Sequence, residues 1–407
     1  MPDTDRYTLI SADTHALAAD EVYRYYLDPS FRPAFDDSVG FARRHETEEP
    51  EDESLLDLDT QRNTLQEAQG VVGEVVFPDG RPPFYPNNVF LSGPPSPTDY
   101  VNRRAGVRAL NRWMVDFCAQ FPVRRAGVGS VLLNNLDDTI TELEWIADHD
   151  LRGGIQLPNI TPDVDWIPQI SDRRYDRLWA ACQDLDLVVN LHVEANVPDF
   201  GNGPIDLIPL ATDGPHTTIR SVVLLVLSGV FDRFPRLRVT LSEVPMGVLS
   251  GLIRFLDTPY GVMRERGLLG TVPIDPSTIV DRLPSDYLGS NVWYTASPLL
   301  AAELDAIRTT VGFDHLMFGN DYPHPEGAYP FTGSILRQVF HDWKPAAVRT
   351  VLADTPAALY GFDLNALAAE AARVGPLVDE IATPLTELPD RPNYALVANA
   401  VATTNEP

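Results

Sequence analysis

The stretches DLVVNLHV (residues 186–193), TTIRSVVLLVLSGVFDRF (217–234) and LRVTLSE (237–243) indicate how this chain folds. The first and third are short, rich in β-branched residues and bounded by polar residues, which is typical of buried strands. The middle stretch is long enough for a helix, with apolar residues recurring along it. A strand, a helix and a second strand in this order imply two parallel strands joined by a right-handed crossover.

The same alternation extends along most of the chain. Six further apolar segments predict strands, at Thr8–Asp13, Gly70–Pro78, Arg125–Leu133, Gly153–Pro158, Asn291–Ala296 and His315–Asp321. Helical segments separate many of these strands, for example residues 136–150 with an apolar stripe on one face. Eight strands alternating with helices predict an α/β fold, the closed TIM (β/α)₈ barrel. An open doubly wound sheet is the alternative, but no glycine-rich fingerprint follows the first strand.

The spacing of these segments predicts additions to a simple barrel. We expect the barrel to span residues 1–363, with a long insertion at about 16–69 that includes the acidic tract ETEEPEDES (46–54), interpreted as a solvated loop. A Pro- and Asn-rich segment within about 79–105 predicts a structured loop over the barrel mouth. Residues 364–407 predict a C-terminal extension that wraps a partner subunit or is partly disordered.

Composition excludes several classes of partner. The formal charge of −27 argues against binding to nucleic acid or to anionic membranes. No apolar run has the length of a membrane span, and the first residues do not read as a secretory signal. Cys118 and Cys182 lie far apart and are interpreted as buried thiols, which fits a reducing cytoplasm. We therefore expect a cytoplasmic protein that acts on a small molecule, with a homodimer as an open alternative to a monomer.

The chain contains a single lysine, Lys344. Schiff-base catalysis, a phosphate-binding P-loop or a carboxylated lysine bridging two metals would each have to use it. It lies in DWKPAAV, a predicted helix start far from any strand end. These chemistries are therefore not expected.

The predicted strands end in metal-ligand residue types. The first ends in Asp13-Thr14-His15, and two residues spaced by two point to the same side of a strand. The fifth, sixth and eighth end at His192, Glu243 and Asp321. Any one of these could be a hydrogen-bonded structural residue or a helix cap. Because active sites of this fold lie at the C-terminal strand ends, the set predicts a site for zinc, manganese or iron.

Four segments, ISADTH, LHV, GVFDRFPRLRVTLSE and FGNDYPHPEG, resemble the amidohydrolase superfamily. The resemblance is to the branch that includes aminocarboxymuconate semialdehyde decarboxylase and resorcylate-type decarboxylases, and it extends from about Tyr7 to Phe362. It implies one divalent metal held by Asp13, His15, His192 and Asp321, with zinc expected and manganese or iron as alternatives. Two positions depart from the usual pattern, since Asp13 replaces a histidine and Glu243 stands where many relatives have histidine.

The main functional expectation is a metal-dependent hydrolase in which activated water attacks an amide, lactone or ester. Asp321 would transfer the proton, Glu243 would orient the substrate or share the acid–base work, and His324 would contact the substrate or support the site. The alternative is a non-oxidative decarboxylase; other lyase or hydratase chemistry and a barrel that only binds remain open. Aromatic residues expected at the mouth favour a small cyclic or aromatic substrate (Phe84, Tyr85, Phe90, Phe200, Trp293, Tyr294, Tyr322 and Tyr329).

Overall fold

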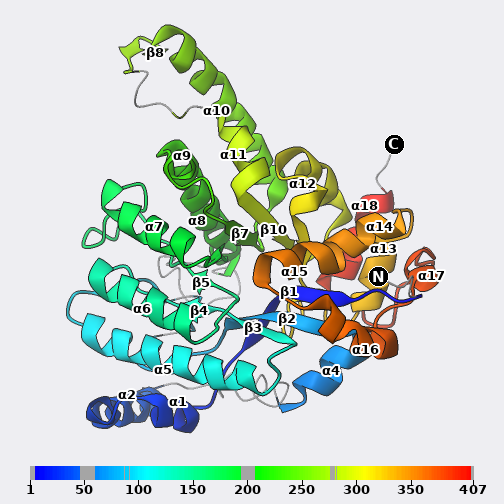
Figure 1. Cartoon of the computed structure of the whole chain (residues 1–407), viewed down its shortest axis with the longest axis horizontal. Coiled ribbons are helices and arrows are strands. Elements are labelled where there is room, and N and C mark those ends of the chain that lie inside the picture. Colours follow the sequence, from blue (N-terminus) through cyan, green and yellow to red (C-terminus); the bar gives the residue numbers. More distant parts are fainter. Residues whose placement is uncertain are drawn as a thin grey trace.

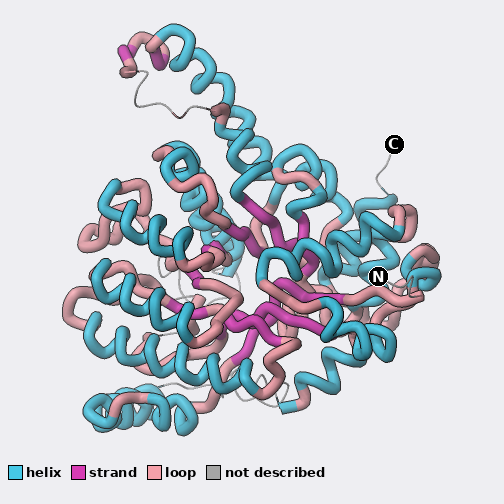
Figure 2. Tube along the Cα trace, in the orientation of Figure 1, coloured by secondary structure: helices cyan, strands magenta, loops and turns pink. Residues whose placement is uncertain are grey.

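All eight predicted strands are present in the computed structural model, which describes residues 5–45, 60–86, 88–90, 92–193, 207–275, 280 and 282–404. In chain order they are β1 (Leu9–Ala16), β2 (Val71–Pro78), β3 (Arg125–Gly127) with β4 (Gly129–Ser130), β5 (Ile155–Gln156), β6 (Val189–Leu191), β7 (Val239–Ser242), β10 (Val292–Ala296) and β11 (Leu316–Phe318). The predicted third strand is divided between β3 and β4, which are separated only by Val128. These strands lie at the centre of the molecule, with helices around them (Figures 1 and 2).

The strands form a closed parallel barrel. Their pairings run β1-β2-β3 and then β4-β5-β6-β7-β10-β11, and every pairing in this path is parallel. The seam between β11 and β1 closes by a parallel bridge from Thr14 to Tyr322. There the His15 N–H donates to the Tyr322 carbonyl oxygen (2.7 Å) and the Asp321 N–H to the Asp13 carbonyl oxygen (3.0 Å). The open-sheet alternative is therefore wrong.

Amphipathic helices surround the barrel. The principal ones are α5 (Tyr100–Ala119), α6 (Leu136–Asp148), α7 (Asp176–Asp184), α8 (Leu207–Leu227), α10 (Met246–Arg266), α11 (Pro284–Asn291), α12 (Leu304–Thr310), α13 (Thr332–Phe340) and α15 (Thr355–Tyr360). Helix α6 shows the pattern: Asn135 caps its first turn, and Leu143 and Ile146 on its inner face are completely buried. Lys344 immediately precedes α14 (Pro345–Arg349), the next helix after α13, and is exposed.

The segments outside the simple barrel also form helices. After β1 come α1 (Asp20–Tyr26), α2 (Arg32–His45) and α4 (Arg62–Ala68), whereas the acidic tract 46–54 lies outside the described residues. After residue 363, α16 (Leu364–Val374) packs on β2, α17 (Val378–Ile381) follows, and α18 (Tyr394–Thr404) packs on α13. The described part of the C-terminal segment thus packs on its own barrel. The domain division at residue 363 stays a prediction.

Helix α10 and a two-stranded hairpin, β8 (Leu268–Leu269) and β9 (Val272–Pro273), form an arm that extends away from the barrel (Figure 1). Several large apolar side chains on this arm are exposed: Val248, Phe255, Val262, Leu268, Leu269 and Val272. Exposed apolar patches of this kind mark interaction surfaces in many proteins. Within the described residues, no helix has both the length and the apolar character needed to cross a membrane.

A buried ionic network lies behind the barrel seam. Glu74 of β2 accepts hydrogen bonds from Arg62 and Gln66 of α4 and from Arg125 of β3. Arg62 also donates to the Thr14 hydroxyl (2.8 Å). Burial alone would raise the pKa of Glu74, but the two guanidinium groups outweigh burial and hold that pKa below its usual value. Helix α4 of the insertion therefore supports the strand that carries Asp13 and His15.

We expect Glu74→Gln to lower the free energy of unfolding by about 3–5 kcal/mol, because it leaves two buried arginines without a counter-charge. The measurement is urea denaturation at neutral pH. Glu67→Gln is the matched control, since Glu67 pairs with Arg124 and Arg373 nearer the surface, and it should cost less than about 1 kcal/mol. Because the folded pKa of Glu74 is depressed, the difference from wild type should shrink as pH falls below the unfolded pKa. Equal effects of the two substitutions would contradict the proposed role of the network.

Candidate metal centre

Five acid and imidazole side chains, all buried except the half-buried Glu243, meet at the C-terminal ends of the strands. Asp13 and His15 lie in the second half of β1. His192 directly follows β6, Glu243 directly follows β7, and Asp321 lies three residues after β11. Parallel strands end at the same edge of the barrel, so residues distant in sequence are brought together. The predicted convergence of these residue types is therefore present.

The nitrogen and oxygen atoms lie close to one another. His15 Nε2 is 3.1 Å from Asp321 Oδ1 and 3.4 Å from Asp13 Oδ1. His192 Nε2 is 3.5 Å from the same Asp13 oxygen, and His192 Nδ1 is 3.7 Å from Glu243 Oε2. One atom each from Asp13, His15, His192 and Glu243 lie within 4.8 Å of one another. Ligands about 2.0–2.2 Å from one ion span similar distances, so the group is compact enough to share a metal.

Several of these atoms are buried without a hydrogen-bond partner among the described residues. They are both carboxylate oxygens of Asp13, both ring nitrogens of His15, Nε2 of His192 and Oδ2 of Asp321. A buried polar atom without a partner is costly, and so many at one place call for an explanation. A divalent cation would satisfy them, because neutral imidazole and carboxylate are both metal ligands. The residues present therefore fit a metal ion.

The geometry broadens the predicted ligand set. Asp13, His15 and His192 share their group with Glu243, which the sequence assigned to catalysis. Asp321 belongs to a second, overlapping group with His15, Glu243 and His324. Glu243 is thus common to both groups. The assignment of Asp321 as the fourth ligand, and of Glu243 as a non-ligand, stays a prediction.

The backbone at two of these carboxylates is in the left-handed region. Glu243 has φ +60° and Asp321 has φ +58°, a conformation that few residues other than glycine adopt. Such backbone is concentrated at functional sites, where the surrounding structure maintains it. Gly327 packs so closely on Asp321 that a Cβ atom there would lie 2.2 Å from the Asp321 Cβ. The turn after β11 therefore depends on a residue without a side chain.

The pKa values of the carboxyl groups and of His192 are shifted in different directions. Burial would raise the pKa of Asp321, but the neighbouring His324 and His15 outweigh it and lower that pKa to about 2. Burial, reinforced by Asp321 and Asp13, raises the pKa of Glu243 well above its usual value. Burial opposes protonation of His192, yet the carboxylates of Glu243 and Asp13 raise its pKa to about 10. The carboxylates thus favour a positive charge at this buried site. A bound metal cation would provide that charge in place of a protonated histidine.

One residue of the site, Asp79, was missed from the sequence. Asp79, directly after β2, has its Oδ2 3.0 Å from His324 Nε2, and the other His324 nitrogen is 3.0 Å from Asp321 Oδ1. Asp79 could have been found by the rule that identified the other strand-end residues, since it too directly follows a predicted strand. Phe90, which the sequence placed among the aromatic residues of the mouth, packs its ring against His192 and His15, with ring centroids 4.9 and 5.3 Å apart. An aromatic ring thus covers two candidate ligands from the mouth.

The other aromatic residues expected at the mouth behave unequally. Phe84 and Tyr85 line a separate pocket beside the mouth. Trp293 packs against His315, which precedes β11, so its expected place at the mouth is wrong. Trp293 stands near the start of β10, which places it towards the opposite end of the barrel. Phe200 lies outside the described residues.

Comparison with known proteins supports the resemblance drawn from the sequence. Residues 90–362, more than half of the chain, match the amidohydrolase family model. A gamma-resorcylate decarboxylase from Rhizobium sp. (strain MTP-10005) is 24% identical over 286 residues, which cover 66% of this chain and 78% of that protein.

Solved structures share the fold at lower identity. A 5-carboxyvanillate decarboxylase from Novosphingobium aromaticivorans, with bound manganese and 3-methoxy-4-hydroxy-5-nitrobenzoic acid, aligns with a TM-score of 0.64 at 17% identity, covering 88% of this chain and 98% of that one. A dihydroxybenzoic acid decarboxylase from Polaromonas sp. JS666, with bound manganese and the inhibitor 2-nitroresorcinol, gives a TM-score of 0.60 at 16% identity, covering 87% and 97%. The predicted α/β barrel is confirmed.

Proposed function

The chain belongs to the amidohydrolase family, and on that basis we propose that it is a metal-dependent, non-oxidative decarboxylase of a small aromatic acid. The sequence placed hydrolysis first and decarboxylation second. The relatives described above are decarboxylases of aromatic acids, so the second expectation has the better support. The observation that carries the proposal for this chain is its cluster of unpartnered carboxylate and imidazole atoms beneath the Phe90 ring.

The arrangement suits a planar acid. A divalent ion held by Asp13, His15, His192 and Asp321 would supply positive charge that attracts the substrate's carboxylate and a neighbouring oxygen. The Phe90 ring provides an apolar surface beside the candidate ligands, where an aromatic ring can pack. A carboxylate at the buried end and a ring at the open end would match this pattern.

Glu243 is positioned to deliver a proton. Its side chain is 22% exposed towards the mouth, whereas those of Asp13 and Asp321 are completely buried. In the reaction the bond between the ring carbon and the carboxylate breaks, and its electron pair stays on the ring carbon. Glu243 in its acid form donates a proton to that carbon, and CO₂ leaves. Asp321 is held as an anion between His15 and His324, and Asp79 fixes the orientation of His324.

The test is an assay of hydroxybenzoates beside lactones and amides, with detection of both CO₂ and the organic product. We expect CO₂ in equal amount to a decarboxylated phenol, with one deuterium on the ring when the reaction runs in D₂O. Hydrolysis of a lactone or amide without CO₂ release would restore the hydrolase interpretation. Binding of acids without turnover of any of them would favour the barrel that only binds.

Metal content gives a further prediction. We expect one divalent ion per chain, because the only lysine is remote from the site and cannot bridge a pair. Zinc is the metal expected from the sequence, but we propose manganese, since the site is rich in carboxylates and two relatives have bound manganese. Elemental analysis of purified protein measures the number of ions per chain. Reconstitution with Mn²⁺ or Zn²⁺, followed by activity assays, identifies the metal that supports activity. Two tightly bound ions per chain, both needed for activity, would overturn the mononuclear site.

We also propose that the chain forms a homodimer through the arm of α10. The cytoplasmic location of the protein is a separate prediction that stays untested. Val248, Phe255 and Val262 are exposed and spaced by seven residues, so they form one stripe on the helix. A two-fold axis through Phe255 would place each Val248 opposite Val262 of the second copy. The stripe is therefore complementary to itself, as a closed dimer requires.

Phe255→Glu should shift the molar mass measured by light scattering from dimer to monomer, because it places a charge at the centre of the stripe. Tyr25→Glu is the matched control, since Tyr25 is an equally exposed aromatic on α1, away from the arm. Wild-type protein that is monomeric at all concentrations would exclude this dimer.

A further inference from the structure

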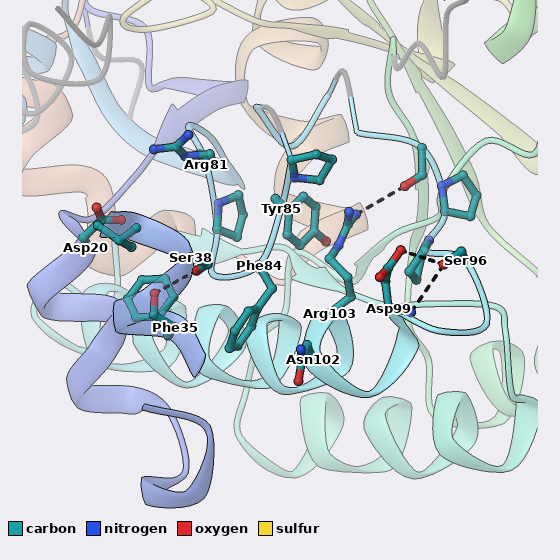
Figure 3. Close-up of a pocket in the computed structure, with 16 residues that line it drawn as sticks. Asp20, Phe35, Ser38, Arg81, Phe84, Tyr85, Ser96, Asp99, Asn102 and Arg103 are labelled. Atoms are coloured by element: carbon teal, nitrogen blue, oxygen red, sulfur yellow. Dashed lines mark hydrogen bonds between the residues drawn. The ribbon is translucent and has the colours of Figure 1, made fainter. Parts of the chain in front are cut away.

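A second cavity lies beside the barrel mouth and contains none of the candidate metal ligands. This outer pocket has a volume of about 750 Å³ and lies between α2, the segment that follows β2, and the first turns of α5 (Figure 3). Its walls include Phe35 of α2, Phe84 and Tyr85 of the segment after β2, and Arg103 of α5. A cavity of this size accommodates a small organic molecule.

Arg103 is the unusual residue of this pocket. Its side chain is almost completely buried, with 4% of its surface exposed, and its guanidinium lies 3.6 Å from the centre of the Tyr85 ring. One terminal nitrogen donates to the Gly93 carbonyl oxygen (3.3 Å), whereas Nε has no hydrogen-bond partner. Asp99 shares the pocket, but its carboxylate accepts from the Ser96 hydroxyl instead (Figure 3).

Two other buried arginines each pair with a carboxylate, whereas Arg103 does not. Arg62 and Arg125 are as deeply buried as Arg103, and both pair with the carboxylate of Glu74. Arg103 forms no ion pair with any acidic side chain in the part of the chain that the structure describes. A buried cation without an anion is costly, so a counter-charge is expected from outside the described residues. The open space beside Arg103 is where that anion would lie.

The walls indicate what the rest of the ligand is like. Phe35 and Phe84 meet edge to face with ring centroids 5.7 Å apart, and Tyr85 lies flat against Arg103. Phe84 holds its place with a left-handed backbone (φ +66°), which is uncommon for an aromatic residue. Aromatic walls favour a flat apolar body, and a guanidinium pairs best with a planar carboxylate. We propose that the outer pocket is a second binding site, separate from the metal centre, for an aromatic carboxylate.

The outer pocket is close to the metal centre yet distinct from it. A smaller space shares Tyr85 and Arg103 and reaches Ser130 and Gln156 at the ends of β4 and β5, but its volume is only about 30 Å³. That is room for a water molecule and not for an aromatic ring. The segment that forms the pocket also carries Asp79 and Phe90, which contact His324, His15 and His192. A ligand in the pocket therefore contacts the same segment that covers the metal centre.

The direct test is crystallography of the metal-loaded wild-type protein with 4-bromobenzoate. We expect an anomalous bromine peak in the outer pocket, with the carboxylate on Arg103. A peak only at the metal centre, or none, would overturn the proposal. This experiment does not depend on turnover, so it can succeed or fail separately from the proposed decarboxylation. The same data distinguish the two sites by position.

Equilibrium binding then tests the role of the charge. Arg103→Met retains the apolar stem and should weaken benzoate binding at the outer pocket by roughly ten- to hundredfold, as measured by calorimetry. Arg104→Met is the matched control, because Arg104 is the next residue of α5 and pairs with Asp138 at the surface; its affinity should match wild type. Benzyl alcohol, which lacks the carboxylate, should bind the wild type and Arg103→Met equally. Unchanged benzoate affinity in folded Arg103→Met would show that Arg103 only clamps Tyr85 and Gly93.

Discussion

Replacing His192 with alanine is expected to remove both the bound metal and the activity while the barrel stays folded. Its Nε2 atom is buried without a hydrogen-bond partner and lies 3.5 Å from Asp13 Oδ1. We therefore expect this nitrogen to bind the metal ion. The backbone position is held independently, because the His192 carbonyl oxygen accepts from the Thr218 hydroxyl (3.0 Å). Metal content should fall from about one ion per chain towards zero, and turnover by on the order of 10³-fold or more.

The measurement combines elemental analysis, kinetics and circular dichroism on one preparation. His216→Ala is the matched control, since His216 is exposed on α8 and should keep both metal and rate. A folded His192→Ala protein with full metal content and full turnover would show that β6 does not supply a ligand. Loss of the circular dichroism signal would instead indicate that the ring is needed for folding through its contacts with Phe77 and Phe90.

Glu243→Gln is expected to leave the metal in place and to lower kcat by roughly 10²–10⁴, the usual contribution of a positioned acid or base. Glutamine keeps the shape and one hydrogen-bonding oxygen but cannot donate a carboxylic acid proton. The side chain faces the mouth more than the other carboxylates do, so it can reach a substrate. Kinetics under substrate saturation, with metal analysis beside them, test this role.

Three results of this substitution have different meanings. Retained metal with a large loss in kcat supports Glu243 as the acid. Lost metal would make Glu243 a ligand, which its presence in both donor groups allows, and would place Asp13 or Asp321 outside the coordination sphere. A lower melting temperature with normal turnover of the folded protein would make it a structural anchor. Glu265→Gln is a suitable control, because Glu265 is an exposed carboxylate on α10 outside both donor groups.

Much of the fold and part of the site could be predicted because both depend on local pattern and parallel geometry. Short β-rich segments separated by helices identified all the strands, and the common edge of parallel strands brought Asp13, His15, His192 and Asp321 together. These inferences require only the order of the elements and the residue at each strand end.

What could not be predicted depends on contacts between distant or irregular segments. The role of Arg62 requires knowing that a helix in the insertion packs on Glu74, and a solvated loop was the expectation for the neighbouring residues. The packing of Phe90 on two imidazoles depends on the path of a Pro-rich segment with no regular periodicity. The overlap of the two donor groups at Glu243 depends on a left-handed backbone, which residue type alone does not indicate.

The place of Lys344 has a practical consequence for attaching this protein to surfaces. Helix α13 begins after the turn at the barrel mouth and returns along the outside, so the residues that follow it lie towards the opposite end of the barrel. Lys344 is there, exposed, and is the only side-chain amine of the chain. Once the α-amino group is blocked, amine-directed coupling can react only at Lys344. Every molecule would then be tethered through one defined point, with its candidate metal centre facing the solution and not the support.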